Sequence, residues 1–203
     1  MNQKIVLFWF RRDLRLEDNA GLFRALSSGY SVIPIFIFDQ NILSSLPKQD
    51  PRLNFIYQSI VRMNKQLQEY QSSIATFYGT PIKILKQLVQ KYPIEKVIAN
   101  TDYEPYAVER DLQIESYLKS QNIDFETFKD HVLFEKSEVV KDDGSPYKVY
   151  TPYSRKWIAK LQKEGVPKYP SMDYLDCFVS HNEKFLTLQN IGFEDVQRKA
   201  PSF

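Results

Sequence analysis

The sequence contains few of the residues that form disulfides and metal sites. It has one cysteine, Cys177, and two histidines, His131 and His181, which lie far apart. A single cysteine excludes an intramolecular disulfide and is typical of a reducing compartment. The histidines have no cysteine partner at the spacing of a zinc site. We therefore expect no metal and a cytoplasmic location.

Glycine is also scarce, and long hydrophobic runs are missing. The six glycines are scattered, so the sequence contains neither a G-x-G-x-x-G fingerprint nor a G-x-x-x-x-G-K-[ST] loop. No run reaches the length of a membrane span, and the N-terminal run leads into charge rather than a signal-peptide cleavage site. The net charge of +2 indicates no nucleic-acid surface. Neither histidine has the neighbourhood of a catalytic base, so we expect no membrane contact and no catalytic residue in this chain.

Hydrophobic segments that suit strands alternate with amphipathic segments that suit helices. We expect strands at residues 4–10, 31–38, 73–78, 96–99 and 124–128, and helices at 20–28, 51–70, 81–92 and 105–120. This alternation predicts an α/β domain with a parallel sheet and helices on both faces. Pro34 is unfavourable inside the second strand, because proline donates no ladder hydrogen bond, and suggests a strand end or an irregular start.

Charged residues follow three of these strands at their carboxyl ends. Arg11 and Arg12 follow the first strand, Asp39 follows the second, and Asp102 and Glu104 follow the fourth. Ligands of open parallel sheets bind at that end, so the pattern indicates a binding crevice. The alternative is a solvated loop in which the arginines pair with neighbouring carboxylates, because surface ion pairs are common and weak.

Aromatic residues near the same strand ends are candidates for stacking on a planar ligand. Phe38 and Tyr103 follow or end a strand at this edge. Trp9 shares the edge, but we expect it in the core because it lies on a buried strand.

The pattern changes after residue 130. Residues 141–146 have turn chemistry, and Pro152 begins a short helix that ends at Gly165. Residues 166–203 show three prolines and no sustained period. We therefore expect one domain at 1–130 and a connecting segment with one short helix at 131–203.

Three segments, in order, carry a resemblance to a known family. FWFRRDLRLEDN (8–19), NTDYEPYAVERD (100–111) and YKVYTPY (147–153) are similar to the amino-terminal α/β domain of the DNA photolyase/cryptochrome family. The resemblance implies a three-layer Rossmann-like domain with a five-stranded parallel sheet in the order 3-2-1-4-5. That order places strands one and four side by side, so the arginine-rich loop and the loop with Asp102 and Glu104 would face each other across a crevice.

The resemblance also implies a function for a longer parent protein. In photolyases, light-excited FAD splits cyclobutane pyrimidine dimers in damaged DNA, which makes the parent a deoxyribodipyrimidine photo-lyase, a carbon–carbon lyase. FAD and DNA are bound by a helical domain that would follow residue 203, so we expect the fragment alone to be inactive, and we expect a monomer. The alternatives are the same domain of a cryptochrome-like blue-light photoreceptor without repair activity and an unrelated nucleotide-binding α/β protein.

The amino-terminal domain of the family holds or borders an antenna chromophore that passes excitation to FAD. Folate-binding members carry an Asn-Glu pair where this chain has Tyr106-Ala107. The missing carboxylate would leave pterin N–H groups unpaired, at a cost of roughly 1–3 kcal/mol each. We therefore expect a flavin-type antenna, or none, ahead of methenyltetrahydrofolate. The resemblance implies that the antenna-binding residues are Arg11, Phe38, Asp39, Asp102 and Glu104.

Overall fold

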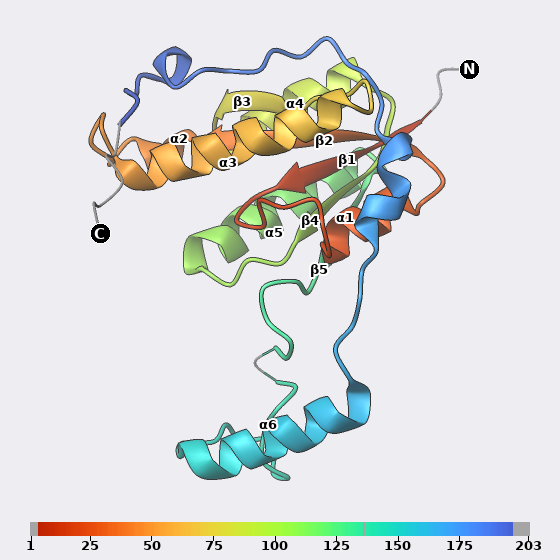
Figure 1. Ribbon diagram of the computed structural model, residues 1–203, viewed down its shortest axis with the longest axis vertical. Coiled ribbons are helices and arrows are strands. Elements are labelled where there is room, and N and C mark those ends of the chain that lie inside the picture. Colours follow the sequence, from red (N-terminus) through yellow and green to blue (C-terminus); the bar gives the residue numbers. More distant parts are fainter. Residues whose placement is uncertain (1–3, 136, 197–203) are drawn as a thin grey trace.

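A computed structural model describes residues 4–135 and 137–196. It contains a sheet of five parallel strands in the order β3-β2-β1-β4-β5 (Figure 1). The strands are β1 (Ile5–Phe10), β2 (Ser31–Asp39), β3 (Ala75–Gly79), β4 (Ile94–Asn100) and β5 (Asp124–Phe128). The predicted fold class and strand order are therefore confirmed, and β1 lies between β2 and β4.

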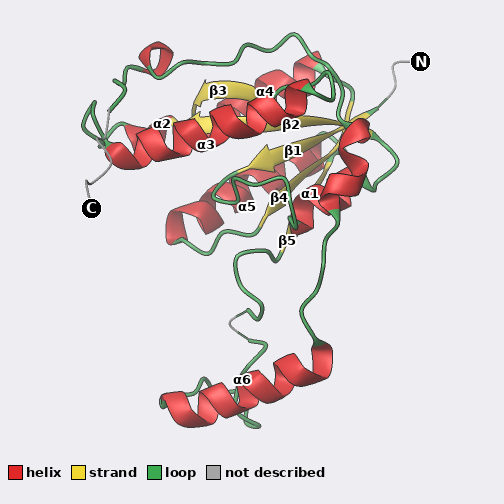
Figure 2. Ribbon diagram, viewed as in Figure 1, coloured by secondary structure: helices red, strands yellow, loops and turns green. Residues whose placement is uncertain are grey.

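Helices cover both faces of this sheet (Figure 2). They are α1 (Ala20–Leu26), α2 (Gln40–Leu43), α3 (Pro51–Gln68), α4 (Pro81–Lys91) and α5 (Pro105–Ser120). Proline opens α3, α4 and α5, where its missing N–H has no intrahelical acceptor to lose. The sequence prediction did not include α2, a single turn capped by the side chain of Asp39. None of the helices in the described part of the chain is both long and apolar enough to cross a membrane.

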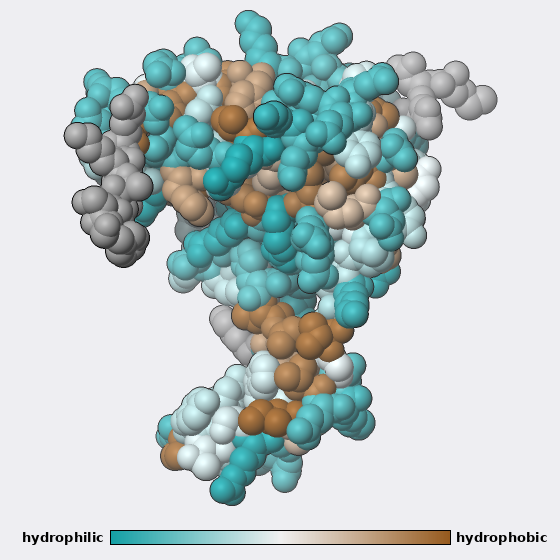
Figure 3. Space-filling model, in the orientation of Figure 1, coloured by the Kyte–Doolittle hydropathy of each residue, from teal (hydrophilic) through white to brown (hydrophobic). Residues whose placement is uncertain are grey.

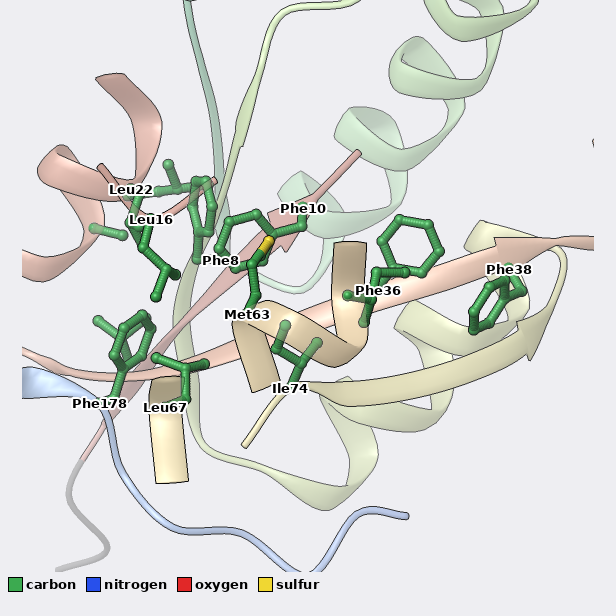
Figure 4. Close-up of a cluster of buried hydrophobic side chains, with 14 of the residues drawn as sticks. Phe8, Phe10, Leu16, Leu22, Phe36, Phe38, Met63, Leu67, Ile74 and Phe178 are labelled. Atoms are coloured by element: carbon green, nitrogen blue, oxygen red, sulfur yellow. The ribbon is translucent and has the colours of Figure 1, made fainter. Parts of the chain in front are cut away.

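Successive residues of β1 enter different hydrophobic cores. Val6, Phe8 and Phe10 pack with α1 and α3, whereas Leu7 and Trp9 pack with α4 and α5. Figure 4 shows the first of these clusters, in which the rings of Phe8 and Phe10 lie beside Met63. This alternation follows from the two-residue period of a strand, and it explains why β1 is an unbroken hydrophobic run.

Pro34 lies inside β2 rather than at an irregular start. It is the fourth residue of the strand and pairs with Phe8 of β1. The pairing of β2 with β3 begins only at Ile35, so no β3 residue lies opposite Pro34. Proline is tolerated because this part of β2 has no β3 partner that needs its N–H.

The helix α6 (Tyr150–Glu164) stands away from the α/β unit (Figure 1). None of its residues is buried, and Trp157 contacts Phe134 of the connecting segment edge to face at 5.5 Å. Figure 3 shows hydrophobic side chains at the narrow part of the molecule between the sheet and α6.

The chain returns to the α/β unit after α6. Two 3-10 helices, η1 (Ser171–Cys177) and η2 (Gln189–Ile191), lie in this stretch, and the N–H of Val179 donates to the Val32 oxygen of β2 at 3.0 Å. Five hydrophobic residues of the stretch are buried: Leu175, Phe178, Leu188, Ile191 and Phe193. We expected residues 131–203 to form a connecting segment with one short helix. Over residues 171–193, the chain is instead part of the core beside α1 and α3.

Candidate ligand-binding site

A cavity of about 310 Å³ lies at the carboxyl ends of β1, β2 and β4. Its apolar wall consists of Trp9, Phe10, Phe36, Ile37, Phe38, Ile42, Leu43, Leu53, Ile56 and Ala107. Its polar groups are Arg11, Arg12, Asp39, Asp102, Glu104, Tyr106 and Arg110. The structure therefore brings all five predicted site residues to one cavity, because parallel strands end at the same edge of the sheet.

Arg12 joins the two loops whose convergence the strand order predicts. Its Nε lies 3.4 Å from Asp102 Oδ2, and its Nη2 lies 3.4 Å from Glu104 Oε1. The Arg12 side chain is 58% exposed, so these pairs lie at the rim of the cavity, where ion pairs contribute little and exchange readily. Arg12 is thus free to turn toward an anionic or carbonyl group of a ligand.

Arg11 is buried and is held by a carboxylate of α5. Its Nη1 and Nη2 donate to the two oxygens of Asp111 at 2.7 and 3.0 Å, and Nη1 also donates to the Asn100 oxygen at 3.2 Å. Its guanidinium lies 4.1 Å from the centre of the Trp9 ring. Burial lowers the pKa of Arg11, and Asp111 opposes this shift. Arg11 therefore ties β1 to α5 in addition to lining the cavity.

The arginines of this loop reach carboxylates outside it. Arg11 pairs with Asp111, and Arg15 makes two hydrogen bonds to Asp130, at 2.9 and 2.8 Å. The alternative, in which these arginines pair with carboxylates of the same loop, is therefore not what the structure shows for Arg11 and Arg15.

Asp39 and Tyr106 close one side of the cavity. The Tyr106 hydroxyl donates to Asp39 Oδ2 at 2.6 Å and accepts from the side-chain amide of Asn41 at 3.0 Å. Asp39 Oδ1 also accepts from the Asn41 N–H and so caps α2. Burial, reinforced by Asp39, raises the pKa of Tyr106. Tyr106 fills part of the crevice wall.

Tyr103 does not line this cavity, so the structure corrects its candidacy as a stacking residue. Its hydroxyl donates to Glu135 Oε1 at 3.0 Å in a separate hollow near α6. Burial, with Glu135 beside it, raises the pKa of Tyr103 to about 12. Trp9 is 2% exposed and belongs to the core, as expected, but it also borders the cavity.

Arg110 and Ile42 were not among the predicted site residues, and Tyr106 was named only as a departure from the folate-binding pattern. Tyr106 and Arg110 are four residues apart on α5, a spacing that puts them on one helix face with the site residue Glu104 just before it. That spacing is a signal that could have indicated both. Ile42 lies on α2, whose four residues are too few to show helical periodicity.

A buried polar network joins the loop after β1 to the end of β4. The side chain of Asn100 donates to Asp13 and, at 2.8 Å, to Asn19. Its Oδ1 accepts from the Gly21 N–H at 2.8 Å. The network connects β4, the loop after β1 and α1, so both sides of the crevice share one support. No group of three or more potential metal ligands occurs among the described residues.

Comparison with known proteins gives concordant results. A family model for DNA photolyase matches residues 6–171. Deoxyribodipyrimidine photo-lyase of Synechococcus sp. is 33% identical over 155 residues, which cover 76% of this chain and 32% of that protein. The chain thus spans about a third of that relative's length.

Two solved structures share the fold. A bacterial class III photolyase from Agrobacterium tumefaciens superposes with a TM-score of 0.76 at 24% identity, covering 94% of this chain and 38% of that one. An archaeal photolyase from Sulfolobus tokodaii, described with two FAD molecules and a novel light-harvesting cofactor, has a TM-score of 0.70 at 28% identity, covering 87% of this chain and 38% of its own. With the family model matching 6–171, the chain belongs to the DNA photolyase family and corresponds to its amino-terminal Rossmann-like domain.

Proposed function

We propose that this chain forms the antenna-chromophore domain of a light-dependent DNA lyase and that its cavity holds a flavin-type chromophore. The observation that carries the proposal is the cavity at the carboxyl ends of β1, β2 and β4, which gathers Arg11, Phe38, Asp39, Asp102 and Glu104. A crevice where the strand order reverses is the ligand site of open α/β sheets.

The residues present fit a planar heterocycle with polar edges. The volume of about 310 Å³ lies at the low end of the range for ligand pockets, roughly 300–1,000 Å³. The apolar wall suits an aromatic ring, and the rim offers both carboxylates and guanidinium groups to ring N–H and C=O groups. Arg11 lines the cavity, and its Nε is buried without a hydrogen-bond partner among the described residues.

The whole protein is proposed to be a deoxyribodipyrimidine photo-lyase that acts on damaged DNA, as a cytoplasmic monomer. The proposed organisation is an α/β domain at 1–130 and a connecting segment at 131–203, of which residues 171–193 pack back on the α/β domain, before a helical FAD domain. The chemistry that bound FAD supplies in this reaction is light-driven electron transfer to a pyrimidine dimer. The role of the residues described above is to bind and orient a chromophore that passes excitation to FAD.

The first test is a titration of the purified chain with FMN, a deazaflavin and methenyltetrahydrofolate, followed by absorption and fluorescence. We expect saturable binding of a flavin-type ligand in preference to the folate. Asp102→Ala should weaken binding at least about tenfold, because a hydrogen bond to a charged group contributes roughly 1.5–3 kcal/mol. Arg12→Ala should weaken it in the same direction, and Lys156→Ala on α6 is the matched control that should leave binding unchanged.

Arg11→Ala is a less informative variant, since it removes the partner of the half-buried Asp111 and so affects folding. Preference for methenyltetrahydrofolate, or no binding of any of the three compounds, would refute the antenna proposal. The repair proposal is tested separately with thymine-dimer DNA under blue light. The 203-residue chain is expected to repair none, whereas a longer protein that contains it should do so. A longer protein that binds FAD but leaves the dimers intact would favour the cryptochrome-like alternative.

A further inference from the structure

The segment 129–135, which leads from β5 toward α6, is attached to both loops at the rim of the cavity (Figure 1). Asp130 accepts two hydrogen bonds from Arg15, on the loop after β1, at 2.9 and 2.8 Å. Glu135 accepts one from the hydroxyl of Tyr103, on the loop after β4, at 3.0 Å. These four residues do not line the cavity. The segment therefore holds both rim loops from outside the ligand site.

The Asp130 carboxylate is buried where this segment leaves the sheet. Its side chain is 1% exposed, and it also accepts from the Ala20 N–H at 2.9 Å. Ala20 is the first residue of α1, where a backbone N–H has no intrahelical acceptor. A bidentate pair between arginine and a carboxylate fixes the direction of the guanidinium as well as its distance. Asp130 therefore restrains the loop that carries Arg12, three residues before Arg15.

Tyr103 lies between two cavity residues in the chain and has its side chain elsewhere. Asp102 and Glu104 border the cavity, and both pair with Arg12 across the rim. Tyr103 instead borders the separate hollow near α6. Its hydrogen bond to Glu135 therefore restrains the turn that presents the two carboxylates to Arg12.

We infer that Asp130 and Glu135 are positioning residues for the ligand site, and that ligand binding in the cavity is coupled to the order of the segment 129–135. This inference rests on the proposed ligand-binding function of the cavity. Local opening of the segment releases both rim loops, so a ligand that contacts both loops binds tightly only when the segment is in place. By linkage, the bound ligand stabilises the segment by the same factor.

The test removes the hydrogen bond between Tyr103 and Glu135 and follows FMN binding to the 203-residue chain by fluorescence. Tyr103→Phe keeps the ring and should weaken FMN binding several-fold, and Glu135→Ala should do the same. Glu135→Gln keeps an acceptor oxygen and should bind FMN as the wild type does. The double variant Tyr103→Phe/Glu135→Ala should be no weaker than either single variant, because both remove one hydrogen bond. Tyr147→Phe, whose ring packs against Tyr153 at 6.2 Å, is the matched control and should leave binding unchanged.

Hydrogen exchange of the ligand-free chain provides a second readout that does not depend on any ligand. Amides at 101–104 should exchange faster in Tyr103→Phe and Glu135→Ala than in the wild type and Glu135→Gln, while β1 and β4 keep their protection. Arg15→Lys, which cannot form the bidentate pair with Asp130, should accelerate exchange at 11–15. In the wild type, bound FMN should slow exchange over 129–135.

The outcomes separate the positioning role from the proposed function. An unchanged FMN affinity of Tyr103→Phe, or unchanged exchange at 101–104, would overturn the positioning role while the cavity stands as the ligand site. Faster exchange throughout β1 and β4 would also overturn it, because the hydrogen bond would then support the fold in general. If the wild type binds no FMN, the antenna proposal fails, and exchange at 101–104 in the ligand-free variants alone decides whether the segment positions the rim.

Discussion

Asn100, at the end of β4, connects this strand to the loop after β1. Its side-chain amide donates to Asp13 and Asn19, and its oxygen accepts from the Gly21 N–H. These residues are buried, so each hydrogen bond that is lost leaves a polar group without water. Asp13 and Asn19, which belong to the sequence signature at 8–19, are therefore conformational supports.

Gly21 allows this close approach, which gives a prediction for one residue. A Cβ at position 21 would lie 2.6 Å from Asn100 Oδ1 and 3.1 Å from the Phe8 ring. Gly21→Ala should therefore lower the free energy of unfolding by about 1–3 kcal/mol, through overpacking and displacement of Asn100. Urea unfolding followed by circular dichroism measures the change. An unchanged midpoint would show that α1 is not packed this closely on β4.

At the scale of a single element, the N-cap of helix α3 is Asp50, whose carboxylate can be protonated. Asp50 Oδ1 accepts from the Arg52 N–H at 2.8 Å, and its carboxylate pairs with the Arg52 guanidinium at 2.6 Å. The hydrogen bonds from the Arg52 side chain lower the pKa of Asp50 to about 2. Because the folded pKa is below the ordinary value of 3.8, the contribution to stability is present above pH 4 and is lost as the pH falls toward 2.

Asp50→Asn tests this titration, because asparagine keeps a capping oxygen and has no charge. The wild type should be more stable than the variant at pH 7, and the two melting temperatures should converge between pH 4 and pH 2. Thermal unfolding at pH 7, 4, 3 and 2 provides the measurement. A difference that stays constant across this range would show that Asp50 does not carry the charge-dependent part of the cap.

At the scale of the whole molecule, the returning segment at 171–193 completes the core. Phe178 is 4% exposed and bridges to β2, whereas Trp157 lies on α6, which has no buried residue. Phe178→Ala should lower the free energy of unfolding by about 3–5 kcal/mol. Trp157→Ala is the matched aromatic control and should cost less than about 1.5 kcal/mol, the value of one aromatic pair. Equal losses in guanidinium unfolding would contradict this division of the molecule.

Much of the secondary structure can be predicted from local sequence. Pro51, Pro81 and Pro105 open helices where they were expected, and buried strands are short hydrophobic runs that end in charge. The one-turn helix α2 and the 3-10 helices of the returning segment were not predicted. They are too short for a periodic pattern, and their positions depend on contacts with distant parts of the chain.

The sequence by itself determined an α/β chain with polar groups at the carboxyl ends of its strands, and its motifs indicated the family. Only the tertiary structure decided which other residues share the cavity. Tyr106 and Arg110 reach it because α5 packs beside Trp9, and Ile42 reaches it because Asp39 turns the chain into α2. The physical reason is that local propensity depends on neighbours in sequence, whereas a cavity is made by side chains that packing brings together from separate elements.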